Sequence, residues 1–101
     1  MITHTVLFRL KRPTDDRTRK QFVEALQRFA AAAPRAARPA VVQESLLLRG
    51  ESPRTADALL EVTFAGPEDF NPYLISDEHE ALLHDVLEPY CEGWWSVQFE
   101  S

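Results

Sequence analysis

The chain of 101 residues is 45% hydrophobic and 27% charged, with a net charge of −5. Its length suits one hydrophobic core, so we expect a single domain over residues 1–101. The negative charge argues against a nucleic-acid partner, and no apolar run approaches the roughly 18 residues that span a bilayer. The N-terminus lacks the pattern of a signal peptide, and the lone Cys91 excludes an intrachain disulfide. Both features favour a cytoplasmic protein without a membrane partner.

The first predicted element is a strand over residues 2–11, because apolar and polar residues alternate there. Pro13 ends this strand, and Thr14 is the expected N-cap of a helix over residues 14–33. The apolar residues of the helix fall within one arc of a helical wheel, which indicates one buried face. They are Phe22, Val23, Leu26, Phe29, Ala30 and Ala33.

The second half of the chain is predicted to begin with strands over residues 40–49 and 57–64. A loop with a short helical turn follows. A second helix is expected over residues 77–90, with Ser76 as its N-cap. The alternating residues 94–100 predict a final strand.

The order β-α-β-β-α-β is typical of the ferredoxin-like α+β fold, an antiparallel sheet with both helices on one face. The open face of that sheet would carry Leu7, Leu59 and Trp94. Because these side chains are too apolar to be left fully in water, we expect a second subunit to cover them.

Two of the three histidines are predicted to point into the space between the sheet and the helices. On a helical wheel, the large apolar residues of the second helix centre on His79, whereas His84 falls on the polar face. His4 shares the apolar face of the first strand. Such histidines are often hydrogen-bonded core residues, but two that converge near Tyr73 also suit a functional site, since each needs a partner once desolvated.

The segments "ITHTVLFRLK", "DALLEVTF", "FNPYLISDEHEALLHDVLEPY" and "WWSVQFE" resemble the stress-responsive dimeric α/β-barrel (Dabb) family. The resemblance runs from Ile2 to Glu100 in the expected order. It implies a ferredoxin-like fold and a homodimer in which two subunits join their sheets into a dimeric α/β barrel.

The same resemblance implies a chemistry. Some members of the family are stress-associated proteins without assigned chemistry, whereas olivetolic acid cyclase-type polyketide cyclases close an aromatic ring by intramolecular aldol condensation. By this resemblance His79 is the general base, Tyr73 assists it, and His4 is the third catalytic candidate. The ligand would be a small hydrophobic polyketide-like molecule, with no metal and no cofactor. The residues expected as pocket walls, each of which would otherwise be plain core, are Phe8, Phe22, Leu26 and Val86.

One departure from the family pattern concerns the substrate. Relatives often carry a histidine-proline pair between the tyrosine and the catalytic histidine that match Tyr73 and His79. This chain has Ser76-Asp77 there. The change removes one imidazole and adds a carboxylate that we expect near the pocket mouth. Two other functions stay open, a non-catalytic stress-associated or ligand-binding dimer, and a ferredoxin-like monooxygenase.

Overall fold

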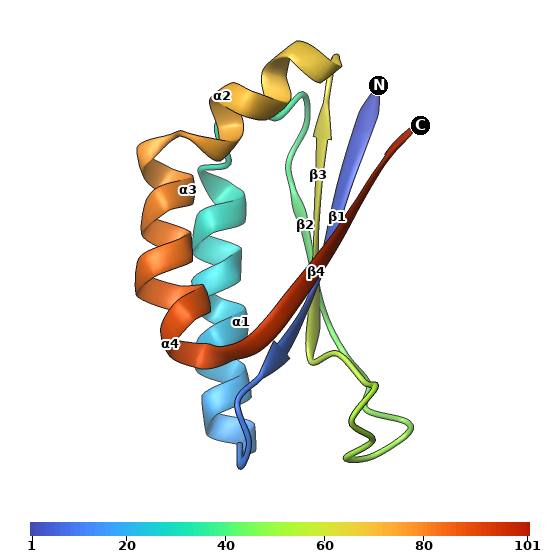
Figure 1. Ribbon diagram of the computed structural model, residues 1–101, viewed down its shortest axis with the longest axis vertical. Coiled ribbons are helices and arrows are strands. Elements are labelled where there is room, and N and C mark those ends of the chain that lie inside the picture. The colour runs from blue at the N-terminus through green and yellow to red at the C-terminus, as the bar shows by residue number, and fades with distance from the viewer.

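The computed structural model describes residues 1–101. Its four strands form one antiparallel sheet in the order β2-β3-β1-β4, and the helices cover one face of it (Figure 1). This is the predicted ferredoxin-like arrangement. The elements in chain order are β1 (Ile2–Leu10), α1 (Asp16–Ala31), β2 (Val41–Glu44), β3 (Ala58–Phe64), η1 (Pro67–Asp69), α2 (Phe70–Leu74), α3 (Asp77–Leu82), η2 (Leu83–Leu87), α4 (Glu88–Tyr90) and β4 (Cys91–Glu100).

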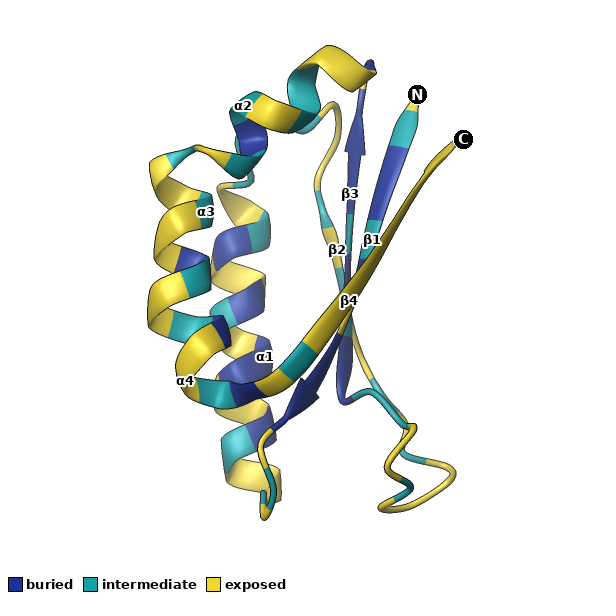
Figure 2. Cartoon of the chain, viewed as in Figure 1, coloured by how far each residue is buried: buried dark blue, intermediate teal, exposed yellow.

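The core lies between α1 and the face of the sheet that the helices cover. Phe8 and Leu10 of β1 are each 1% exposed, and Phe22 and Leu26 of α1 are fully buried. The rings of Phe8 and Phe22 meet edge to face, with centroids 5.5 Å apart. Burying each such side chain contributes about 1.5–3 kcal/mol, so the apolar arc of α1 holds this helix on the sheet. Figure 2 shows β3 buried along most of its length and β4 exposed along most of its own.

The helix α1 begins at Asp16, one residue later than the start that a Thr14 N-cap would give. The carboxylate of Asp15 accepts a hydrogen bond from the Thr18 backbone N–H at 2.8 Å, and Asp15 is therefore the N-cap. The hydroxyl of Thr14 is buried without a hydrogen-bond partner. The prediction of Thr14 was wrong because both residue types can cap a helix and the carboxylate is the stronger acceptor.

The strand predicted over residues 40–49 is shorter in the structure, since β2 spans only Val41–Glu44. Ser45 ends it by accepting a hydrogen bond at its hydroxyl from the Leu47 backbone N–H, and Leu47 adopts a left-handed φ of 54°. Leu46 and Leu48 are consequently 82% and 87% exposed. Their apolar character resembled that of a strand, but the local turn takes the chain off the sheet.

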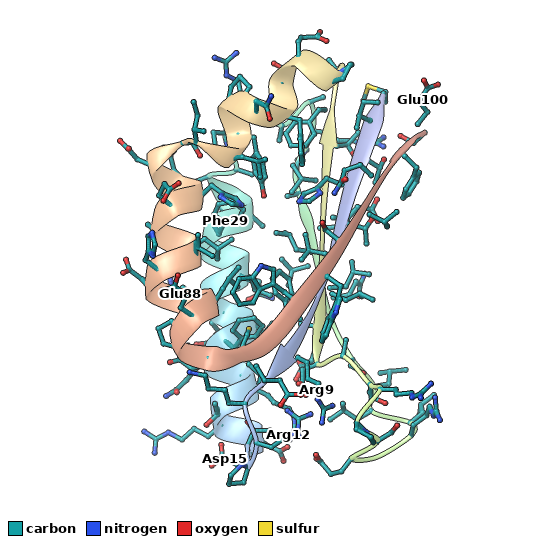
Figure 3. All side chains as sticks on the ribbon, in the orientation of Figure 1. Arg9, Arg12, Asp15, Phe29, Glu88 and Glu100 are labelled. Atoms are coloured by element: carbon teal, nitrogen blue, oxygen red, sulfur yellow. The ribbon has the colours of Figure 1, made fainter.

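A buried ionic network fixes the end of the molecule opposite the chain termini. Asp57, 2% exposed, accepts hydrogen bonds from the Leu10 N–H at 2.8 Å, Arg12 Nη1 at 3.0 Å and Arg19 Nε at 3.2 Å. Burial by itself would raise the pKa of Asp57, but the hydrogen bonds from Arg12, Leu10 and Arg19 lower it overall. Figure 3 shows Arg12 and Asp15 together at this end. The network joins β1, α1 and the loop before β3.

The last helix is continuous from Asp77 to Tyr90 but changes its winding. Ser76 is its N-cap as predicted, because its hydroxyl accepts from the His79 N–H at 3.1 Å. The segment η2 is a π-helix in which the Glu88 N–H donates to the Leu83 carbonyl. Pro89 accounts for this wider turn, because proline has no N–H and its ring clashes with the carbonyl four residues earlier. None of the helices combines the length and apolarity that crossing a bilayer requires.

The two faces of β4 are the reverse of the prediction. In the register with β1, Leu7 pairs with Trp95 and Phe8 with Trp94, so Trp94 shares the covered face with Phe8. The expectation that Trp94 lies on the open face was wrong. That face carries Leu7 together with Trp95, Val97 and Phe99, which are 58%, 57% and 48% exposed.

Candidate active site

An apolar cavity of about 140 Å³ lies between the sheet and the last helix. This volume is close to the roughly 150 Å³ of an engineered protein cavity that holds benzene, so the space admits one six-membered ring. Apolar walls with a few converging polar groups are typical of small-molecule sites. The lining residues are His4, Val6, Phe8, Leu60, Tyr73, Leu74, His79, Leu82, Leu83, Leu87, Trp94 and Ser96.

His79 enters the cavity from the first turn of α3. Its Nδ1 is buried and has no hydrogen-bond partner. Burial lowers the pKa of His79 below its ordinary value of 6.5, although Glu80 and the Leu74 backbone act in the opposite direction. The imidazole is therefore neutral at neutral pH and can accept a proton.

Tyr73 reaches the same cavity from α2 and is held on several sides. It is 1% exposed, and its ring lies edge to face with Phe64 at 5.1 Å and with His79 at 5.0 Å between centroids. Burial raises the pKa of the Tyr73 hydroxyl far above its ordinary range. The hydroxyl therefore stays protonated and can donate a hydrogen bond beside the His79 ring.

His4 completes the polar side of the cavity from the centre of the sheet. It is 5% exposed, and its Nδ1 lies 2.8 Å from Nε2 of Gln98 on the neighbouring strand. The pKa of His4 is lowered to about 4. Burial is the larger cause, and the nearby His79 is the smaller one. His4 is thus a neutral imidazole at neutral pH, 5.9 Å from Tyr73 between ring centroids.

The comparisons with known proteins agree with this architecture. The family model described as "Stress responsive A/B Barrel Domain", Dabb, matches residues 2–101. The chain belongs to the Dabb family. A comparison with curated proteins found no match.

Several solved structures are similar to this Dabb chain. A dimeric ferredoxin-like protein of unknown function from Thermobifida fusca is 24% identical with a TM-score of 0.77, over 99% of this chain and 90% of that one. A Dabb family protein with a ferredoxin-like fold from Mesorhizobium loti is 20% identical with a TM-score of 0.77, over 99% and 95%. A hydroxynitrile lyase from Passiflora edulis is 18% identical with a TM-score of 0.72, over 97% and 90%. At these identities the likeness establishes the fold alone.

The structure brings His4, Tyr73 and His79 together around the one cavity, although they come from three elements. Of the four expected wall residues, Phe8 lines the cavity. Phe22 and Leu26 are fully buried in the core. Val86 lies instead in a shallow groove between α1 and α3, beside Phe29 and Ala25. Figure 3 shows Phe29 between the two helices.

Ser76-Asp77, where the chain departs from its relatives, does not line the cavity. Ser76 is occupied as the helix cap, and its hydroxyl also donates to the Tyr73 carbonyl at 2.7 Å. Asp77 is exposed in the first turn of α3. The pair therefore links Tyr73 to the helix that carries His79, and it acts on the site through their positions.

Sequence reasoning missed the contribution of β4. Trp94 and Ser96 line the cavity, and Gln98 touches His4. The signal that would have found them is the pairing of the two terminal strands, in which Ile2 faces Glu100 and His4 faces Gln98. Directly paired residues of an antiparallel sheet share a face, so the position of His4 fixes the inward side of β4.

Proposed function

We propose that the protein is a cofactor-independent cyclase of the lyase type. It would close a ring by intramolecular aldol condensation of a poly-β-keto or β-dicarbonyl substrate. The observation that carries this proposal is the His79 imidazole beside the Tyr73 hydroxyl in an apolar cavity.

The chemistry needs only proton transfers and one new carbon–carbon bond. The His79 imidazole takes a proton from a carbon that lies between two carbonyl groups, which leaves an enolate. The enolate carbon attacks a carbonyl carbon further along the same molecule, and the Tyr73 hydroxyl donates a hydrogen bond to the oxygen that becomes negative. Protonated His79 then returns the proton to that oxygen. Loss of water from the resulting alcohol gives a cyclic enone, and enolisation of the remaining ring ketones gives the aromatic ring.

The size of the cavity favours a substrate that forms a single ring. Its walls on the last helix are the aliphatic side chains of Leu82, Leu83 and Leu87. Apolar walls give a folded chain of carbonyl groups no competing hydrogen bonds, so the substrate would be held with its reacting carbons close together. Such positioning can supply several kcal/mol of the barrier, on the order of 7–11 in the best model reactions.

The test uses a synthetic linear 3,5,7-trioxo acyl thioester as the probe, which forms lactones without any catalyst. We expect the protein to divert this probe to the carbocyclic aldol product, measured by liquid chromatography and mass spectrometry. Replacing Tyr73 with phenylalanine removes the donor and should lower the rate of aldol product formation roughly 100-fold. The ring contacts of Tyr73 would be kept, so circular dichroism should stay unchanged.

Three outcomes would contradict the cyclase. Identical product mixtures with and without the protein would remove the catalytic proposal. Saturable binding of the probe without any product change would favour the non-catalytic ligand-binding alternative. Oxygen uptake with an oxidised product would favour a monooxygenase.

We also propose that the protein is a homodimer joined through the open face of the sheet. Trp95, Val97 and Phe99 form a continuous exposed apolar stripe next to Leu7. Similar proteins are described as dimeric, and two copies of this face would bury each other as the two halves of a barrel.

Replacing Val97 with glutamate should break this dimer. The substitution would bury an unpaired carboxylate at the centre of the interface, so we expect the dissociation constant of the dimer to rise on the order of 100-fold or more. Sedimentation velocity measures the shift to monomer. Gln27→Glu adds the same charge to the exposed side of α1 and should leave the dimer intact. Equal sedimentation of both variants would contradict the proposed interface.

A further inference from the structure

The contact between Gln98 and His4 bears on which ring nitrogen of His4 carries its proton. Gln98 Nε2 lies 2.8 Å from His4 Nδ1 and 3.2 Å from the hydroxyl oxygen of Ser96. An amide NH₂ group has two hydrogens and cannot accept. One hydrogen therefore goes to His4 Nδ1 and the other to Ser96. With both hydrogens used, the amide acts as the donor to both of these neighbours.

An imidazole that accepts at Nδ1 must carry its proton at Nε2 when it is neutral. The backbone holds this arrangement in place, because His4 and Gln98 are directly paired residues of β1 and β4. Protonation of His4 at Nδ1 would place one donor against another. Gln98 thus opposes the charged form of His4 as well as the other neutral tautomer.

The two histidines of the cavity therefore have different roles, since His79 can accept a proton and His4 can donate a hydrogen bond. Glu80 and the Leu74 backbone favour the protonated form of His79, whereas Gln98 occupies the Nδ1 of His4 and opposes its protonation. His4 can offer the cavity only its Nε2–H. A neutral imidazole that donates a hydrogen bond can polarise a carbonyl group without itself losing a proton.

We propose that Gln98 is a positioning residue that holds His4 in the Nε2–H form, so that His4 donates a hydrogen bond to the substrate oxygen that becomes negative. This inference rests on the proposed aldol chemistry, in which His79 removes the proton and Tyr73 provides the other donor. It assigns His4 the role of a second hydrogen-bond donor and excludes it as a second base.

The decisive variant is Gln98→Glu, which keeps the shape of the side chain but presents only acceptors to His4. The carboxylate would draw the His4 proton to Nδ1, which leaves Nε2 as an acceptor toward the cavity. Gln98→Met, similar in length and without charge, removes the donor and leaves the tautomer unfixed. A merely structural role of Gln98 would be preserved best by the isosteric glutamate.

Nitrogen-15 NMR of the imidazoles reads the tautomer directly and does not depend on turnover. At neutral pH we expect the wild-type His4 signals of a protonated Nε2 and an unprotonated Nδ1, and the reverse in Gln98→Glu. With the trioxo thioester, we expect kcat to fall on the order of 10-fold or more in Gln98→Glu and less in Gln98→Met, with KM nearly constant in both.

The outcomes separate this inference from the proposed function. A protonated Nδ1 in the wild type, or the same tautomer in wild type and Gln98→Glu, overturns the inference whatever the activity. A reversed tautomer with unchanged kcat overturns the donor role of His4. Absence of aldol product from the wild type overturns the proposed function, and with it the donor role, while the NMR signals still decide whether Gln98 sets the tautomer.

Discussion

Replacing His79 with alanine is expected to slow proton abstraction in the cavity about 100- to 10,000-fold, the usual contribution of a positioned general base. The measurement does not require the natural substrate. Nitrobenzisoxazole loses a carbon-bound proton to a base, its N–O bond breaks, and the electron pair leaves on oxygen as a coloured cyanonitrophenolate. Its absorbance reports directly on a base in an apolar site. Alanine at this position keeps the backbone N–H that Ser76 caps, so α3 should remain folded.

The chain provides a matched control for this prediction on the same helix. His84 is exposed and lies 3.3 Å from both Glu80 and Glu88, outside the cavity. His84→Ala removes an imidazole of equal size and should leave the rate unchanged. Full activity in His79→Ala, or equal loss in both variants, would exclude His79 as the base.

The pH dependence of the same reaction has a defined direction. Burial lowers the pKa of His79, so the deprotonated, active form persists below pH 6.5, where an exposed histidine is already mostly charged. We therefore expect the rate to rise with pH to a plateau, with the midpoint of the rise below that of an exposed histidine.

Replacing Asp57 with alanine should destabilise the protein by about 3–5 kcal/mol, the typical loss when one partner of a buried ion pair is removed. The guanidinium groups of Arg12 and Arg19 would lose their shared carboxylate, and the Leu10 N–H would lose its acceptor. Arg19 is only 8% exposed, so water cannot replace the lost contacts. Urea unfolding at neutral pH measures this loss.

Asp16→Ala is the appropriate comparison for the ionic network. Asp16 lies 3.3 Å from Arg19, but its side chain is fully exposed, so its removal should cost well under 1 kcal/mol. The contribution of Asp57 should be complete above its unfolded pKa of about 4 and should disappear as the pH falls through its lower folded value. Equal effects of the two substitutions would contradict the central position of Asp57.

The parts of the site that the sequence predicted depend on local physics. The position of His79 follows from the wheel of a single helix, and the Ser76 cap from residues three apart. The placement of His4 follows from the alternation of one strand. Each of these predictions needed only neighbours within one element, and the structure agrees with each.

The parts of the site that could not be predicted from the sequence depend on contacts between segments far apart in the chain. Alternation in β4 separates Trp94 from Trp95 but does not say which of them faces the helices. The usual assumption, that the more apolar side is the core, fails here because Trp95, Val97 and Phe99 lie on the open face. The cavity walls were equally inaccessible, because Phe22 and Phe8 are both apolar and only three-dimensional packing separates a core side chain from a lining one.

The π-helical segment η2 keeps the cavity-lining residues of the last helix in a straight row. In a regular helix, residues at every fourth position drift around the axis, because 3.6 residues complete a turn. The wider turn between Leu83 and Leu87 counters this drift, and His79, Leu83 and Leu87 all line the cavity. These positions follow one another about 6 Å apart along the helix. These residues therefore form one straight wall of the cavity along the helix, with the His79 imidazole at one end of it.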